Sequence, residues 1–177
     1  MIGSFPRDDN RVPITSEGVQ VTKAIVTNST AATAVVPIFA VTGSVKVKSL
    51  YGVVTTTLGS NQTAAHWRLN DQTVATQVIS LVTGTTVSNA AVGSLLIRHS
   101  LVSVALKLST AAAGVVFDPV AATAPDLMMP FGVIQKVGGI LSQIEYVYTT
   151  NQNPTTGAIT FYINYIPLTP TSRIDPA

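Results

Sequence analysis

The sequence predicts an all-β fold, an antiparallel β-sandwich that is jelly-roll-like and carries an extended N-terminal arm. From Val19 onward, β-branched residues dominate and recur at every second position, which is the spacing of a strand with one buried face. Polar or glycine-rich separators follow at intervals of about 8 to 12 residues, as is typical of sandwiches and barrels. No segment keeps a helical apolar stripe over three turns.

Residues 1–18 are predicted to form the arm. They hold Gly3, Pro6 and Pro13 and show no sustained apolar period. A proline disfavours helical geometry in the residue before it, so we expect the arm to lie along a surface or to reach a neighbouring protein. The arm's start also lacks the basic residues and apolar core of a signal peptide. Its candidate partner-binding residues are Phe5, Arg7, Asp8, Asp9, Asn10, Arg11 and Val12.

A single β-sandwich domain is expected at 19–168, followed by a C-terminal tail at 169–177. In one well-patterned strand, Lys46 and Lys48 share the outer face, and Tyr51 shares the inner face with Val45 and Val47. Weaker strands are expected at Val19–Thr27, Ala34–Val41, Ala64–Asn70, Val74–Val82, Ser94–His99, Val102–Ser109 and Gly132–Lys136.

The two clearest strands are expected at 140–150 and 158–166. The turn-forming residues between them, which include Asn153, Pro154 and Gly157, predict that the two strands form a hairpin. The inner faces are expected to hold Ile140, Ile144, Tyr146 and Tyr148 in the first strand and Ile159, Phe161, Ile163 and Tyr165 in the second. The outer faces are expected to hold Gln143, Glu145, Thr160, Tyr162 and Asn164.

The segment 118–130, which contains three prolines, is predicted to be a long loop. Its Met128 and Met129 either plug one end of the core or dock on a partner, because methionine adapts to irregular apolar surfaces. Trp67 and Tyr162 are the aromatic residues that we expect on an outer face among polar neighbours, where they could contact a partner.

Charge is scarce in this chain. Only 10% of the residues are Asp, Glu, Lys or Arg, whereas 46% are hydrophobic, and a soluble domain usually carries about a quarter charged residues. The apolar runs at 34–41 and 111–117 are too short to span a membrane. The basic residues are scattered, so no tract exists to neutralise phosphates, and nucleic-acid binding is disfavoured. The surface is therefore expected to be neutral and polar, or covered by copies of the chain.

No constellation for catalysis or metal binding is visible. Cysteine is absent, and His66 and His99 show no metal-binding spacing. The sequence has no GxSxG nucleophile motif and no phosphate-binding glycine loop, and its carboxylates are dispersed. We therefore expect no enzyme activity, no cofactor and no metal.

Three stretches carry a family resemblance: Asp9–Pro13, then Phe39–Val45 running into Leu50–Thr57, and finally Gly157–Leu168. Through them the chain resembles tailed-bacteriophage minor structural proteins of the head-decoration (capsid cement) kind, which are compact β-sandwiches that coat the capsid. Such relatives often carry an acidic turn in mid-chain, but Val82–Ser88 contains no acid, so a contact made by that turn is not expected here.

The resemblance implies a virion structural protein on the outer surface of the capsid, made in the bacterial host cytoplasm. It implies an oligomer, with a homotrimer favoured, bound to the major capsid protein or to neighbouring virion proteins. It supplies no catalytic residues. A phage tail, baseplate or head-fibre anchoring component would have the same composition, and a carbohydrate-binding β-sandwich for host attachment would expose aromatic residues. A small-virus coat would have a basic arm, whereas this arm balances two arginines with two aspartates.

Deleting residues 1–13 tests the role of the arm. We expect the sandwich to stay folded and binding to the capsid to weaken, because the arm adds contacts without contributing to the core. Occupancy on purified particles measures the effect, and unchanged occupancy would remove the arm from the interface.

Overall fold

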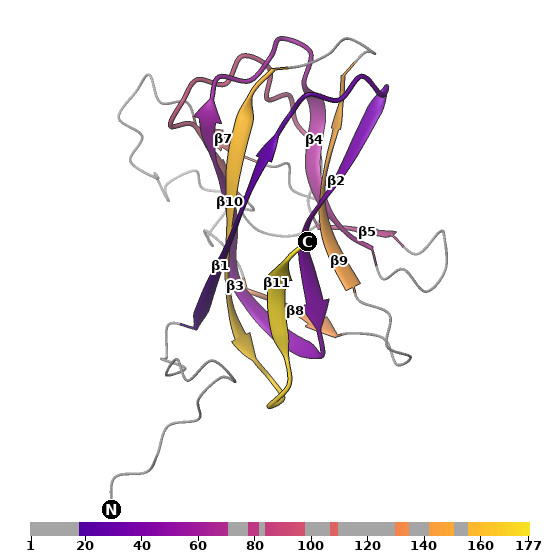
Figure 1. Ribbon diagram of the computed structural model, residues 1–177, viewed down its shortest axis with the longest axis vertical. Helices are drawn as coiled ribbons and strands as arrows, with labels where there is room; N and C mark the ends of the chain where they lie inside the picture. Colours follow the sequence, from indigo (N-terminus) through magenta and orange to yellow (C-terminus); the bar gives the residue numbers. More distant parts are fainter. Residues whose placement is uncertain are drawn as a thin grey trace, which may run out of the picture.

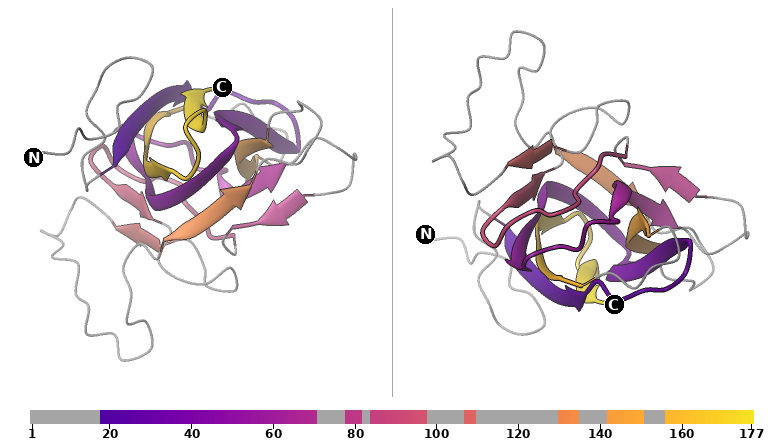
Figure 2. Two further views of the ribbon diagram at one scale, coloured as in Figure 1. Left: turned by 90° about the horizontal axis from the view of Figure 1, so that it is seen from below. Right: turned by 90° about the horizontal axis from the view of Figure 1, so that it is seen from above.

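The computed structural model shows two antiparallel sheets packed face to face, which confirms the predicted sandwich (Figure 1). The end-on views show the two layers (Figure 2). The structure describes residues 18–70, 78–81, 84–97, 107–109, 130–134, 142–150 and 156–177, and contains no helix within these ranges. Their strands are β1 (Val19–Val26), β2 (Thr33–Thr42), β3 (Ser44–Thr56), β4 (Thr63–Asn70), β5 (Val78–Ser80), β6 (Leu95–Ile97), β7 (Lys107–Ser109), β8 (Phe131–Ile134), β9 (Ser142–Thr149), β10 (Ala158–Pro167) and β11 (Arg173–Pro176). Each of the weaker predicted strands overlaps one of them, and β2, β4 and β8 begin one residue earlier than predicted.

The strand order is that of a jelly roll. One sheet runs β1-β10-β3-β6-β7, with β8 also paired to β3, and the other runs β11-β2-β9-β4-β5. The pairs β1–β10, β2–β9, β3–β6 and β4–β5 are all antiparallel. The chain is thus a long antiparallel ribbon that pairs its early strands with its late ones and is rolled into two layers, which is the jelly-roll arrangement.

This topology overturns the predicted hairpin. β9 pairs with β2 and β4, whereas β10 pairs with β1 and β3 in the other sheet. The chain therefore passes from one layer to the other between the end of β9 at Thr149 and the start of β10 at Ala158. Alternation indicates which face of a strand is buried, but it does not identify the strand's partner.

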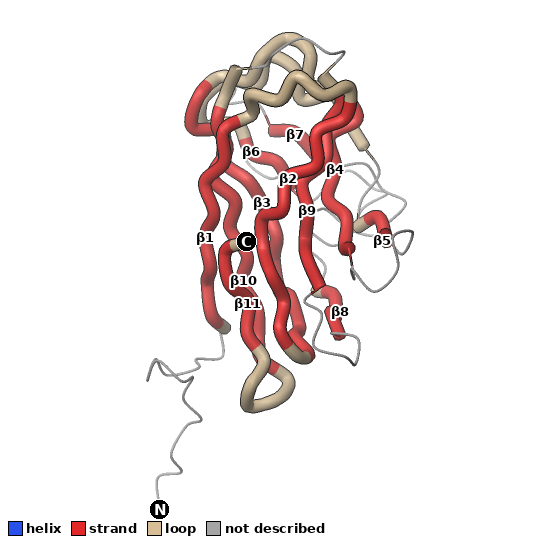
Figure 3. The backbone as a smooth tube through the Cα atoms, turned by 45° about the vertical axis from the view of Figure 1, so that its right-hand side comes forward, coloured by secondary structure: helices blue, strands red, loops and turns tan. Residues whose placement is uncertain are grey.

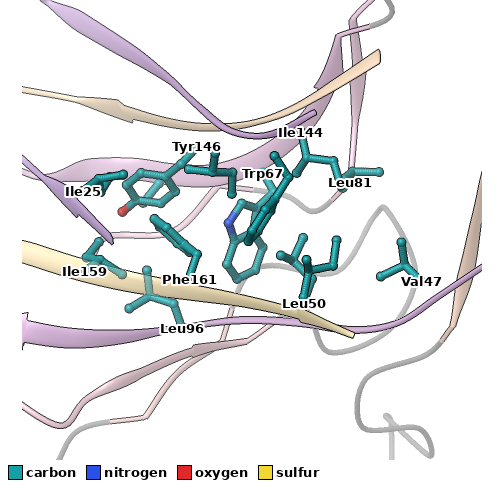
Figure 4. Packing of buried hydrophobic residues seen from close by; sticks show 14 of the residues in the cluster. Ile25, Val47, Leu50, Trp67, Leu81, Leu96, Ile144, Tyr146, Ile159 and Phe161 are labelled. Carbon is teal, nitrogen blue, oxygen red and sulfur yellow. The ribbon is translucent and has the colours of Figure 1, made fainter. Parts of the chain in front are cut away.

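Aromatic side chains join the two layers at the centre of the core (Figure 4). Phe161 of β10 lies edge-on to Trp67 of β4, with ring centroids 6.2 Å apart, and 5.1 Å from the ring of Tyr146 on β9. All three side chains are fully buried. The prediction that Phe161 shares an inner face with Ile159, Ile163 and Tyr165 is confirmed. Burial of this kind contributes about 1.5–3 kcal/mol for each large side chain.

A β-bulge in β3 corrects the predicted face of Tyr51. Val47 pairs with Tyr165 and Ser49 with Asn164, so Lys48 is an extra residue in the ladder. An extra residue reverses the faces of every side chain that follows it. Tyr51 consequently points outward and is partly exposed, and the prediction that it lies on the inner face is wrong.

The predicted C-terminal tail contains β11, which pairs with β2 from Arg173 opposite Thr42 onward. Beside it, Lys23 occupies an inner-face position of the edge strand β1, opposite Phe161. Its Nζ donates a hydrogen bond to the backbone oxygen of Ala177, just after β11. Lys23 therefore links the edge strand β1 of one sheet to the end of the edge strand β11 of the other sheet.

Gly52 of β3 faces the Phe161 ring, and a Cβ at this position would lie 2.8 Å from Phe161 Cε1. The ring is backed by other buried aromatics, so Gly52→Ala is expected to lower the free energy of unfolding by about 1–3 kcal/mol. Urea denaturation measures it. Gly132→Ala in β8 is the control, because a Cβ there meets nothing within 4 Å. Equal effects of the two substitutions would contradict the packing argument.

Candidate interaction surface

The described loops at one end of the sandwich carry no charged residue. This uncharged loop end comprises residues 26–33, 55–64, 84–94 and 156–158 and lies uppermost in Figures 1 and 3. A surface of this size ordinarily holds several charges. The charged residues in the described part of the chain lie on the strands instead: Lys23, Lys46, Lys48, Arg68, Lys107, Glu145, Arg173 and Asp175.

Backbone hydrogen bonds between loops tie this end together. The N–H of Gly59 donates to the Thr156 carbonyl at 2.7 Å, and the Gly59 carbonyl accepts from the Asn89 N–H at 3.2 Å. The N–H of Thr27 donates to the Gly157 carbonyl at 2.9 Å. Loops that are distant in sequence therefore hold one another in a fixed arrangement.

The fully buried Gln62 is the side chain that joins these loops. Its Nε2 donates to Thr27 Oγ1 at 2.7 Å, and its backbone carbonyl accepts from the Val87 N–H and the Ser88 hydroxyl, at 3.0 and 2.9 Å. Buried hydrogen bonds of this kind give a loop cluster a single conformation. The exposed surface above Gln62 is thus preordered without any ion pair.

Small and β-branched side chains cover the outside of the uncharged loop end. Val26 is 64% exposed and Val92 is 55% exposed, and the residues around them are mainly alanine, threonine and serine. Such side chains lose little rotamer freedom when a partner covers them. Binding a protein here would therefore cost little ordering entropy.

A second surface, here called the tyrosine face, lies on the outside of β1, β10 and β3. Tyr51 and Tyr162 stack with ring centroids 4.9 Å apart and planes 9° apart. Asn164 Nδ2 donates to Ser49 Oγ at 2.8 Å, and the Gln20 side chain hydrogen-bonds to Tyr51. Burial raises the pKa of Tyr51, the neighbouring Tyr162 adds to that rise, and the Gln20 hydrogen bond opposes it. The tyrosine face comprises these five residues, and Tyr162 is partly exposed, as predicted.

The prediction that Trp67 lies on an outer face is wrong. Its side chain is fully buried against Phe161. On β4, Trp67 shares a face with the buried Ala65, whereas the polar His66 and Arg68 occupy the opposite face. Trp67 therefore stabilises the core.

Glu145 lies on the outer side of β9 yet is buried, with its side chain 4% exposed. Its Oε2 accepts from Arg68 Nε at 2.5 Å, and its Oε1 accepts from Asn70 Nδ2 at 3.0 Å. Both carboxylate oxygens are thereby engaged within the sheet. Removing Arg68 would leave the buried Glu145 carboxylate without a compensating charge. We therefore assign this ion pair a structural role.

The remaining predicted contact residues lie outside the described residues. They are Phe5, Arg7, Asp8, Asp9, Asn10, Arg11 and Val12 of the arm, together with Met128 and Met129. Among the residues that the structure does describe, no group of three or more His, Asp or Glu is placed to hold a metal ion. The same residues include no helix that is long and apolar enough to cross a membrane.

Comparisons with known protein families, with curated proteins and with solved structures give no match to this chain. The fold defines it as a jelly-roll protein, and the described loops that gather at the end formed by 26–33, 55–64, 84–94 and 156–158 carry no charge. Sequence reasoning missed that end, because it is assembled from four separate segments. The signal that could have found it is the absence of charge from every one of those segments.

Replacing Gln62 tests whether it holds the loops together. Gln62→Ala removes the hydrogen bond to Thr27 and leaves a cavity, so we expect it to cost about 1–3 kcal/mol of unfolding free energy. The Val87 amide should then exchange faster with solvent. Urea denaturation and hydrogen exchange measure these effects, with the exposed Ser60→Ala as control. If both variants behave alike, Gln62 does not organise the loops.

Proposed function

We propose that this chain is a virion structural protein, a capsid decoration or cement subunit that binds and stabilises a phage head shell. The observation that carries the proposal is the uncharged loop end, whose loops are fixed by buried hydrogen bonds. Charged residues are depleted at the centres of protein interfaces, because a buried charge without a partner is costly. A preordered surface without charge suits contact with another protein.

The proposed mechanism is mechanical. A standard interface buries about 800 Å² on each partner, and apolar burial contributes about 25 cal/mol per Å². A subunit that bridges neighbouring capsid proteins through such an interface would make their separation less favourable. The shell would then resist expansion and rupture.

The proposed partner is the major capsid protein or a neighbouring virion protein, and the proposed assembly is a homotrimer on the outer capsid surface. The resemblance described above supports both proposals. The arm at 1–18 would supply a second contact, and the uncharged loop end the first. A tail, baseplate or head-fibre anchoring component would use the same surface at another location.

Two matched substitutions at opposite ends of the sandwich test the proposed contact. Val92 of the uncharged loop end is 55% exposed, and Leu168, in the turn after β10 at the other end, is 56% exposed (Figure 1). Val92→Asp is expected to weaken binding by about tenfold or more, because it places an unpaired charge in the interface. Leu168→Asp is expected to leave binding unchanged.

The assay is co-sedimentation with heads that lack this chain, purified from the phage whose genome encodes it. Binding to heads with the expected loss in Val92→Asp supports the proposal. Equal binding by both variants would remove the uncharged loop end from the contact. Binding to purified tails, with no binding to heads, would favour the tail component instead.

A further inference from the structure

Among the described residues, the Tyr162 ring stacks on one other aromatic ring, that of Tyr51. The strand register places Thr22, Tyr162 and Tyr51 in one row across β1, β10 and β3. Tyr51 covers one side of the Tyr162 ring, with parallel planes. On the other side stands Thr22, a short and exposed residue of the edge strand β1. The outer surface therefore drops from the large Tyr162 side chain to the small Thr22 side chain. This drop is here called the step.

Fixed polar groups lie beside this step. The adjacent row on the same face holds Gln20, Asn164 and Ser49. Ser49 fixes the Asn164 amide through a 2.8 Å hydrogen bond from Nδ2, which leaves Asn164 Oδ1 free to accept from a ligand. The hydrogen bond between Gln20 and Tyr51 brings a second amide next to the rings. The side-chain amides of Gln20 and Asn164 thus lie next to the stacked tyrosine rings.

Charge is absent from the outer-face positions of β1 and β10, which alternate with the buried ones. Lys23 belongs to the inner face, whereas the exposed Lys46 and the partly exposed Lys48 lie on β3, on the far side of β10 from Thr22. No carboxylate occurs in β1, β3 or β10. Thr22, Tyr162, Gln20 and Asn164 therefore offer hydrogen-bonding groups and an aromatic ring but no charge, which suits a neutral ligand with hydroxyl groups.

We propose that Thr22, Tyr162, Gln20 and Asn164 form a shallow site for one neutral pyranose residue of a glycan. The C–H face of a pyranose packs on a tyrosine ring, and its hydroxyl groups exchange hydrogen bonds with amides and hydroxyls. A site this open binds weakly, with a Kd of order millimolar. Copies arrayed on one particle would convert such weak contacts into firm attachment to a glycan-coated surface. The site itself stands independently of the decoration function proposed above, whereas the firm attachment rests on it.

The test is saturation-transfer NMR on the full chain with the methyl glycosides of glucose, galactose, mannose and N-acetylglucosamine. At least one glycoside is expected to receive saturation. Tyr162→Ala is expected to weaken its binding about tenfold or more, and Tyr162→Phe to change it less than about threefold, because the ring face is kept. Thr22→Trp, at an exposed position, is expected to fill the step and abolish binding.

A matched control keeps the outcomes distinct. Leu168→Asp, in the turn after β10 and outside both candidate surfaces, is expected to leave glycoside binding unchanged, and urea denaturation confirms that each variant is folded. Absence of saturation transfer to all four glycosides would overturn the site. Binding that survives both Tyr162→Ala and Thr22→Trp would overturn it as well. Concentration-dependent shifts of the tyrosine-face resonances without sugar would overturn it too, by showing an interface between copies of the chain.

Discussion

The position of β10 between β1 and β3 is the constraint on which the rest of the structure depends. This pairing brings the first and last strands of the ribbon together, and its inner side places Phe161 against the aromatics of the other sheet. Its outer side aligns the rows of the tyrosine face. Because these contacts link residues that are far apart in sequence, the chain has to close large loops before they form, and folding is expected to be slow.

The sequence predicted which face of a strand is buried better than it predicted which strands pair. Uninterrupted alternation in 158–166 correctly indicated the buried side of β10. The outward Tyr51 depends on the bulge at Lys48, which a regular period of two does not reveal. The hairpin failed because turn-forming residues occur equally in loops that cross between sheets. β11 was missed because Arg173–Pro176 is short, bears two charges and contains a proline.

The two candidate surfaces also depend on strand pairing, which the sequence did not predict. The sequence shows that charge is scarce, but the fold shows where it is missing. The segments at 26–33, 55–64, 84–94 and 156–158 meet only because the ribbon is rolled, and Gln62 is recognisable as a joining residue only when its partners are known. Tyr162 was predicted to face outward, yet its stacking on Tyr51 required the register between β10 and β3.

Lys23, on the inner face of β1, affects how copies of the chain behave when they are crowded together. An exposed strand edge invites pairing with the edge of another molecule, and an inward-pointing charge on such a strand opposes that pairing. A second β1 docked against this edge would have to displace the contact between Lys23 and Ala177 and bury an ammonium group. Under the proposed function, many copies crowd onto one particle, and Lys23 would help to keep them as discrete sandwiches rather than a continuous fibre of sheet.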